Sequence, residues 1–288
     1  MAAPVTADQD EYLGEHHVYG PHRAGLPPLG RYFRELWRRR PFVRELARAE
    51  LKAQNYQTFF GQAWLVLSPL LNAAVYFILV DILSSGRNRA PNYITHLLAG
   101  MFAYTFFSGG VSQSAGSVVS GGKLILNTAF PRLLLPITQI VIAFFRFLPT
   151  LPVLALVMAL NNRNHVTWAL LLTVPVFALL VLFTSGVGFL CATLQVYNTD
   201  FKNLLPYLLR LGLYLTPILW FADSGGARTK IASYNPLSPI FELWSDAIVR
   251  GEVAAAGIWL RAVLFSIAIF VVGFVVYVSR ERDYAVRI

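Results

Sequence analysis

One stretch decides the fold of this chain: residues 41–81, PFVRELARAELKAQNYQTFFGQAWLVLSPLLNAAVYFILVD. Its first part has helical spacing, with an apolar face that includes Phe42 and Leu46 and a basic face that includes Arg48. Residues 62–80 carry no charge, and about 20 such residues cross the roughly 30 Å core of a bilayer. We therefore expect a basic helix on one membrane face that leads directly into a spanning helix. Because Arg and Lys beside a span favour the cytoplasm, the N-terminus is expected inside.

The composition places the whole chain in the same class. It has 288 residues, of which 56% are hydrophobic and only 14% are charged, as in an all-α membrane protein with several spans. The net charge of +9 raises nucleic acid as an alternative partner. However, the basic residues cluster beside apolar runs, which topology and anionic lipid explain better. We expect membrane lipids as a partner and no nucleic acid. The single Cys191 excludes an internal disulfide.

The N-terminal part divides into a tail and two helices. Residues 1–30 mix charges, Gly and Pro without periodicity, and we interpret them as a flexible cytoplasmic tail. Its histidines lack Cys or carboxylates at ligand spacing, so no metal site is expected. Residues 31–54 are expected to form amphipathic helices that lie along the membrane interface. Packing on a protein partner is the alternative for the first of them.

A six-helix transmembrane domain is expected over residues 55–288. The apolar runs cover residues 62–80, 93–119, 133–160, 168–196, 204–220 and 257–278. Residues 235–248 are amphipathic but too short to cross, which predicts a re-entrant helix from the outer face. More Lys and Arg residues fall inside than outside on this topology, so both termini are expected in the cytoplasm.

Small residues mark two of the spans. Ser108, Ser112, Gly116 and Ser120 recur every four residues in the second span. Such a stripe lets helices approach closely, or it lines a polar path, and we favour close packing. Gly186 and its neighbours predict close packing in the fourth span as well.

The segment SGGKLILNTAFPRLLLP, residues 120–136, resembles a phosphate-binding loop only superficially. That loop requires G-x-x-x-x-G-K followed by Ser or Thr, and here Ser117 and Leu124 occupy two of the required positions. We therefore expect a short cytoplasmic helix here and no ATP hydrolysis by the isolated chain.

Several short motifs together resemble one family. They are GQAW at 61–64, FPR at 130–132, YNTDF at 197–201, YLTPI at 214–218 and YNP at 234–236. In this order they resemble the permease subunit of type-2 ABC exporters for polysaccharides, the group that exports O-antigen, teichoic acid and mycobacterial galactan. The resemblance covers residue 32 to the C-terminus. Thr199 departs from the family's usual Arg before Asp, so no charge pair is expected in that turn.

The resemblance implies an assembly and a cargo. The chain would form a homodimer and bind two copies of a separate ABC ATPase, which would hold ATP and Mg, while this chain itself would bind no cofactor. The location would be the bacterial cytoplasmic (inner) membrane. The cargo would be a glycan on a polyprenyl pyrophosphate lipid, moved from the cytoplasmic to the outer face.

The resemblance also implies two functional segments. An ATPase-coupling helix maps onto residues 122–130 and includes Lys123, Leu124, Ile125, Leu126 and Asn127. Outer re-entrant helices map onto residues 233–250, and the gate residues expected there are Asn235, Pro236, Phe241 and Trp244.

The expected transport path combines two arginines with aromatic residues. Arg146 and Arg210 bring obligate charges into spans, so each should face the bundle interior or water. We favour pairing between helices over binding of a pyrophosphate. Tyr104 lies about 16 Å along its helix from Tyr93, too deep for an interfacial belt. Its hydroxyl needs either a sugar path or a neighbouring helix, and both remain open. The other aromatic residues of the expected path are Phe107, Tyr207 and Tyr214.

Other functions remain as alternatives. A type-2 ABC exporter of a drug or small lipid would share the same architecture. A multispan lipid-linked sugar transferase would need a carboxylate cluster at a membrane face, whereas the acidic residues here are scattered singly. An ion-driven transporter would usually carry carboxylates inside its spans, and these spans have none away from their ends.

Overall fold

The computed structural model describes residues 28–53, 59–84, 92–128, 130–161, 167–222 and 226–287. The predicted flexible tail lies outside this part except for its last three residues. Every regular element in the described part is helical, so the predicted all-α class is confirmed. The main helices are α1 (Leu29–Arg38), α2 (Arg40–Ala53), α3 (Trp64–Ser84), α4 (Tyr93–Ser120), α5 (Gly122–Asn127), α6 (Leu134–Phe147), α7 (Thr150–Asn161), α8 (Thr173–Tyr197), α9 (Phe201–Leu215), α10 (Gly226–Tyr234), α11 (Ser238–Ser245), α12 (Ala256–Arg280) and α13 (Tyr284–Arg287). The shorter elements are η2 (Gly61–Ala63), η4 (Trp168–Leu172), the π-helix η5 (Asp246–Arg250) and η6 (Glu281–Asp283).

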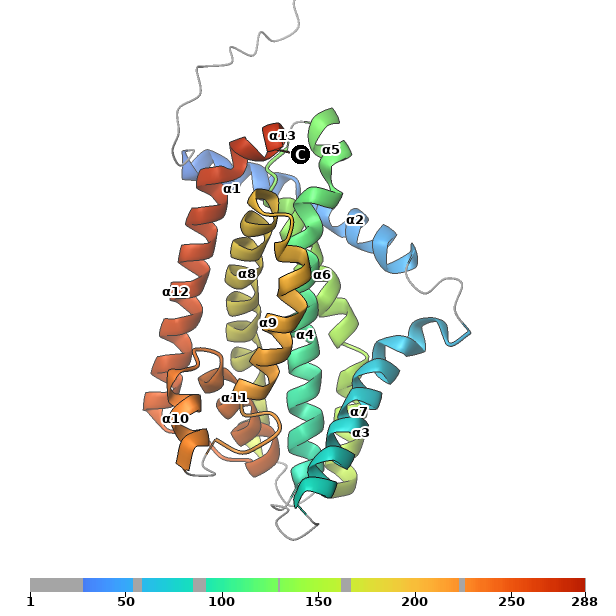
Figure 1. Ribbon diagram of the computed structural model, residues 1–288, viewed down its shortest axis with the longest axis vertical. Helices are drawn as coiled ribbons and strands as arrows, with labels where there is room; N and C mark the ends of the chain where they lie inside the picture. Colours follow the sequence, from blue (N-terminus) through green and yellow to red (C-terminus); the bar gives the residue numbers. More distant parts are fainter. Residues whose placement is uncertain are drawn as a thin grey trace, which may run out of the picture.

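The helices form an elongated bundle in which α4, α6, α8 and α12 run side by side (Figure 1). The short helices α1, α2, α5 and α13 gather at one end, which we call the basic end because α1 and α2 are rich in Arg. The hairpin of α10, α11 and η5 lies at the opposite end. The chain therefore has two chemically different ends joined by long apolar helices.

Five stretches of the described chain are long and apolar enough to cross a membrane: Gly61–Leu79, Tyr93–Ser120, Leu134–Asn161, Trp168–Tyr197 and Ala256–Asp283. They match five of the predicted spans. The remaining predicted span, residues 204–220, is helical only as far as Leu215, the end of α9. The 15 residues of α9 reach about 22 Å, less than a bilayer core. Pro217 lacks the N–H that a continuing helix would need, so the helix stops before it.

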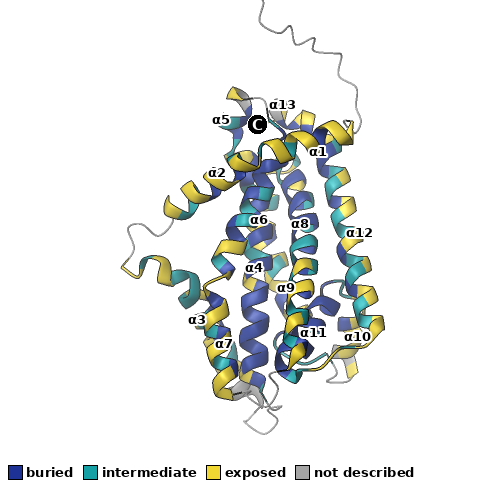
Figure 2. Ribbon diagram, turned by 180° about the vertical axis from the view of Figure 1, so that it is seen from behind, coloured by how far each residue is buried: buried dark blue, intermediate teal, exposed yellow. Residues whose placement is uncertain are grey.

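The centre of the bundle is α4. In its most apolar window 78% of the residues are buried, against 11% for the span that contains α3. Figure 2 shows this contrast, with α4 buried along most of its length and α3 largely exposed. Helices α6 and α8 pack directly on α4, α12 packs on α8, and α3 contacts α4 but leaves most of its own surface exposed.

Two glycines allow α8 and α12 to touch backbone to backbone. A Cβ on Gly186 would lie 2.5 Å from the carbonyl oxygen of Ile269, and a Cβ on Gly273 would lie 2.2 Å from the carbonyl oxygen of Gly186. Neither position has room for a larger residue. The close packing predicted for the fourth span is confirmed, and its partner is the last long helix.

The packed face of α2 differs from the predicted one. Val43 and Ala47 are buried against α6, whereas Phe42 and Leu46 are only half-buried. Gln139 of α6 donates to the carboxylate of Glu50 at 3.0 and 3.3 Å, a contact that apolar spacing does not reveal. The basic residues of this helix are exposed as predicted: Arg44, Arg48 and Lys52.

Candidate functional site

Two cavities open along one face of α4. The first has a volume of about 350 Å³ and lies between α3, α4, α6 and α7. The second has a volume of about 600 Å³ and lies nearer the basic end, between α2, α4, α5 and α6. Gln113 lines both of them, so the two cavities adjoin in the half of α4 that is nearer the basic end.

Polar and apolar side chains share the lining. The side of α4 that faces the cavities presents Thr105, Gly109, Ser112, Gln113, Gly116 and Ser120. Ser112, Gly116 and Ser120 belong to the stripe for which close packing was the favoured interpretation. They line a cavity in this chain, so the geometry supports the alternative interpretation, a polar path. The serine that does pack closely is Ser114, whose Cβ would lie 3.0 Å from a Cβ on Gly188.

The two membrane-depth arginines occupy different surroundings. Arg146 lies in the last turn of α6 and lines the smaller cavity together with Gln113. Arg210 is exposed on α9. An arginine side chain in hydrocarbon is costly. Arg146 faces a cavity, whereas Arg210 is exposed on the surface of the single chain.

The aromatic residues of the expected path fall into two groups. Tyr207 and Tyr214 are exposed on α9, on the same open side as Arg210. The ring of Tyr214 meets Tyr76 of α3 edge-on, with 6.2 Å between the ring centroids. These residues form an aromatic and basic surface, which we call the α9 surface.

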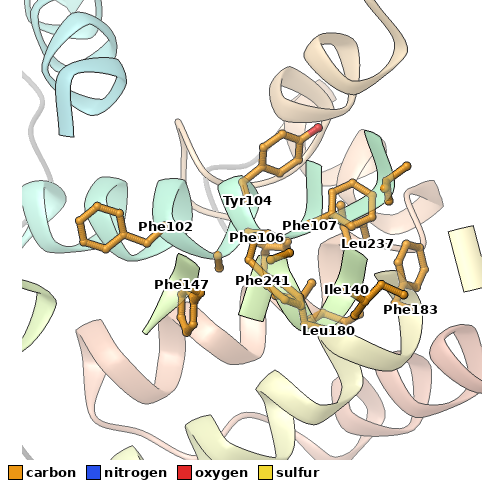
Figure 3. Packing of buried hydrophobic residues seen from close by; sticks show 14 of the residues in the cluster. Phe102, Tyr104, Phe106, Phe107, Ile140, Phe147, Leu180, Phe183, Leu237 and Phe241 are labelled. Carbon is orange, nitrogen blue, oxygen red and sulfur yellow. The ribbon is translucent and has the colours of Figure 1, made fainter. Parts of the chain in front are cut away.

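Tyr104 and Phe107 lie behind that surface, in the buried core. The Tyr104 hydroxyl donates to the carbonyl oxygen of Leu209 on α9, and Figure 3 shows it directed away from the packed phenylalanines. The sequence left two partners open for this hydroxyl, a sugar path and a neighbouring helix. In the single chain the partner is a neighbouring helix, α9, and not the serine stripe. The structure therefore does not bring all the predicted path residues onto one surface.

The predicted outer gate is a well-packed hairpin. Phe241 and Trp244 of α11 are buried, and the Trp244 indole donates to the carbonyl oxygen of Ala99 at 3.0 Å. Asn235 donates to the carbonyl oxygen of Leu215 at 3.1 Å, which ties the hairpin to the end of α9. Pro236 follows directly, in the turn that leads to α11.

Sequence reasoning missed a histidine beside this hairpin. His96 of α4 is buried, with its Nδ1 2.8 Å from the Ser245 hydroxyl and its Nε2 3.2 Å from the carbonyl oxygen of Trp220. Its ring stacks on Phe221 with 4.0 Å between centroids. A polar residue near the start of an otherwise apolar span is the signal that could have identified it.

The predicted coupling segment does form a short helix, α5, at the basic end. Ile125 is buried, and the half-buried Leu124 lines the larger cavity. Asn127 is exposed at the end of the helix, and Lys123 and Leu126 belong to the same helix. The helix is thus anchored by one face.

A hydrogen-bonded network at the basic end was also missed. Glu281, only 7% exposed, accepts from the Tyr32 hydroxyl at 2.6 Å and from the backbone N–H of Arg132. Tyr277 donates to the carbonyl oxygen of Arg132 at 3.0 Å. Burial, together with the nearby carboxylate of Glu281, raises the pKa of Tyr32 above its usual value, so this hydroxyl stays a proton donor. Tyr277 lies one helical turn before Glu281, which is the only sequence signal for this cluster.

The fold and the cavities indicate a multi-pass helical membrane protein whose central helix presents polar residues to internal space, which is typical of transport proteins. No family model matches this sequence. The chain is similar to the O-antigen export system permease protein RfbA of Klebsiella pneumoniae, 28% identical over 205 residues, which cover 70% of this chain and 78% of the relative. It is also similar to the protein of the same name from Myxococcus xanthus, 24% identical over 258 residues, which cover 88% of this chain and 98% of the relative.

These relatives confirm the resemblance to the permease subunits of type-2 ABC exporters for polysaccharides. They are permeases of an export system, which is consistent with a transport subunit and not an enzyme. The similarity to the Myxococcus xanthus protein extends over nearly the whole relative, so it is not confined to one apolar segment.

Proposed function

We propose that this chain is the transmembrane subunit of an ATP-driven exporter that moves a lipid-linked polysaccharide from the cytoplasmic to the outer face of the membrane. The observation that carries the proposal is the similarity to O-antigen export permeases over 88% of the chain. The polar face of α4, open to two cavities, supports it because a glycan needs hydroxyl and amide partners at membrane depth.

The topology that fits this function places the basic end in the cytoplasm, because Arg and Lys beside spans favour that side. Helices α1 and α2 then lie along the inner interface of the bacterial cytoplasmic membrane. Helix α9, continued by the irregular segment after it, makes the sixth crossing, and the hairpin of α10, α11 and η5 dips in from the outer face. Backbone without helix is tolerated at such depth where protein covers it.

Two kinds of partner complete the transporter. A separate ATPase, in two copies, supplies ATP hydrolysis and acts on α5, which lies at the end assigned to the cytoplasm. A second copy of this chain covers the α9 surface, where Arg210 and Tyr207 are exposed. Hydrocarbon would be a costly neighbour for that arginine, which favours a protein or aqueous partner there.

The experiment combines the purified chain with its ATPase in liposomes and follows ATP hydrolysis and the transfer of a labelled lipid-linked glycan. We expect export only with both proteins and ATP, and no ATP turnover by this chain alone. An ATPase variant that binds but does not hydrolyse ATP is the control. Export without the ATPase would overturn the proposal, and equal transfer of the carrier lipid without its glycan would favour the alternative of a small-lipid exporter.

A further inference from the structure

Four segments that are distant in sequence meet at the basic end, around the buried carboxylate of Glu281. Tyr32, 249 positions away, brings in α1 through its hydroxyl. Arg132 brings in the segment between α5 and α6. Tyr284 of α13 lies 2.7 Å from the Thr193 hydroxyl of α8 and donates to the carbonyl oxygen of Tyr277 at 3.3 Å.

Arg132 is fastened on both sides of its backbone. Its N–H donates to the Glu281 carboxylate, and its carbonyl oxygen accepts from Tyr277. Its guanidinium donates to the carbonyl oxygens of Glu281 and Arg282, the latter at 3.3 Å. A connection without regular structure would normally absorb any displacement of α5. This one is fixed to the end of α12 instead, because bonds to charged groups are stronger than those between neutral ones.

A second contact joins α1 to α12 independently of the carboxylate. The ring of Phe33 stacks on Phe274 with 5.5 Å between centroids and 9° between the ring planes. From that point α12 runs without interruption to Ala256. The whole helix has 25 residues and is about 37 Å long. Its backbone contact with α8 at Gly186 holds the two helices together, so α8 would move with α12. A rod of this kind can carry a displacement from the basic end to the outer hairpin.

We propose that Glu281 is a positioning residue that joins α1, the segment after α5, and the inner end of α12 into one rigid unit, so that a displacement of α5 is delivered to α12. This inference rests on the proposed function, because it requires an ATPase that acts on α5. Both backbone groups of Arg132 are bound to the end of the same helix, so the segment after α5 and the end of α12 are held together at two points. To pass on a displacement, these three segments must move as one body, and the hydrogen bonds to Glu281 and Arg132 hold them together.

The test uses the liposomes that contain this chain and its ATPase, and it measures glycan export per ATP hydrolysed. The variants are Glu281→Gln, which removes the charge at nearly constant shape, and Tyr32→Phe, which removes one hydroxyl. The matched controls are Asp283→Asn and Tyr197→Phe, because Tyr197 and Asp283 form a similar but exposed pair at 2.9 Å on the same end.

We expect Glu281→Gln to bind the ATPase normally and to export about tenfold less glycan per ATP, within the usual range of coupling between sites. Tyr32→Phe should lower the same ratio, and the two controls should leave it unchanged. An unchanged ratio in Glu281→Gln would overturn the inference. The unsubstituted complex in the same preparation must export, so a failure of the proposed function is recognised separately.

A second measurement does not depend on the stability of those variants. Phe33→Cys and Phe274→Cys, in a chain that also carries Cys191→Ser, are joined by a short bismaleimide in the assembled complex. We expect the joined complex to export at the rate of the same complex before cross-linking, because α1 and α12 move together. A loss of export on cross-linking would show that α1 leaves α12 during the cycle, and the rigid unit would then be wrong.

Discussion

The indole N–H of Trp244 in α11 donates to the carbonyl oxygen of Ala99 in α4, over 3.0 Å and across 145 positions of sequence. This bond fixes the hairpin of α10, α11 and η5 to the central helix. Trp244→Phe should keep most of the ring packing and lose the bond, at a cost of about 1 kcal/mol in stability. Thermal unfolding in detergent measures the loss. Trp168→Phe, at a site that is 68% exposed, is the control and should leave the unfolding temperature unchanged.

A methyl group at Gly186 should separate α8 from α12. Because the added Cβ of Gly186→Ala would meet backbone atoms of Ile269 and Phe270 at 2.5–2.6 Å, no side chain can move to make room. We expect a loss of about 1–3 kcal/mol, as in other overpacked cores. Gly257→Ala is the matched control, since nothing lies within 4 Å of the added Cβ. Equal unfolding temperatures for the two variants would contradict the close helix contact.

A negative charge on α5 should uncouple ATP hydrolysis from export. Leu124→Glu and Leu126→Glu place a carboxylate in a segment whose proposed role is docking to the ATPase. We expect normal insertion, continued ATP hydrolysis and little export. Anchoring at the membrane interface is the alternative role. Ala49→Glu, at an exposed site on α2 and outside residues 122–130, is the control. Unchanged assembly and export in the Leu variants would refute docking.

The two arginines provide a test of phosphate recognition. Arg146→Lys keeps the charge beside the smaller cavity but loses the planar fork that matches phosphate oxygens. If this guanidinium binds the pyrophosphate of the cargo, the half-saturating cargo concentration should rise about tenfold, the equivalent of one charged hydrogen bond. Arg210→Lys tests the α9 surface in the same way. Normal export by both variants would exclude specific phosphate recognition at either site.

Thiol labelling can place the two tyrosines relative to the path. In a chain with Cys191→Ser, a polar maleimide should label Tyr214→Cys in the assembled complex if the α9 surface lines a water-filled path between the two copies; in the single chain that side chain is 46% exposed. Tyr104→Cys should be protected at rest, where Tyr104 is 5% exposed, and should become labelled during turnover if it faces the path. Protection of both sites in resting and active complexes would place them in the packed core.

The limits of an element could be predicted from the sequence where one physical constraint dominates. A bilayer imposes its own length on apolar runs, so the limits of α4, α8 and α12 were close to the predicted spans. Gly186 predicted a close helix contact for an equally local reason, because a residue without a side chain lets two helix backbones approach each other. The end of α9 was misplaced because the apolar pattern continues past Pro217, although the helix cannot.

Contacts between distant segments could not be predicted in this way. Apolar spacing gave α2 a face that includes Phe42, but the bond between Gln139 and Glu50 accompanies a face centred on Val43 and Ala47. Glu281 looked like one of many scattered acids until the fold brought Tyr32 and Arg132 to it. The smaller cavity depends on where α3 lies relative to α4, and no local pattern specifies that distance.

The exposed surface of α3 has a consequence for how the chain is inserted into the membrane. During synthesis this helix leaves the ribosome before the helices it will join, and even in the finished chain its apolar side chains, including Leu71, Val75, Ile78 and Ile82, remain exposed. Its stability in the bilayer therefore comes largely from contact with acyl chains, and within its own chain its main partner is α4. Substitutions of one apolar residue by another along this helix should be tolerated during biosynthesis. An added charge would instead disfavour insertion at a stage when no other part of the protein could compensate for it.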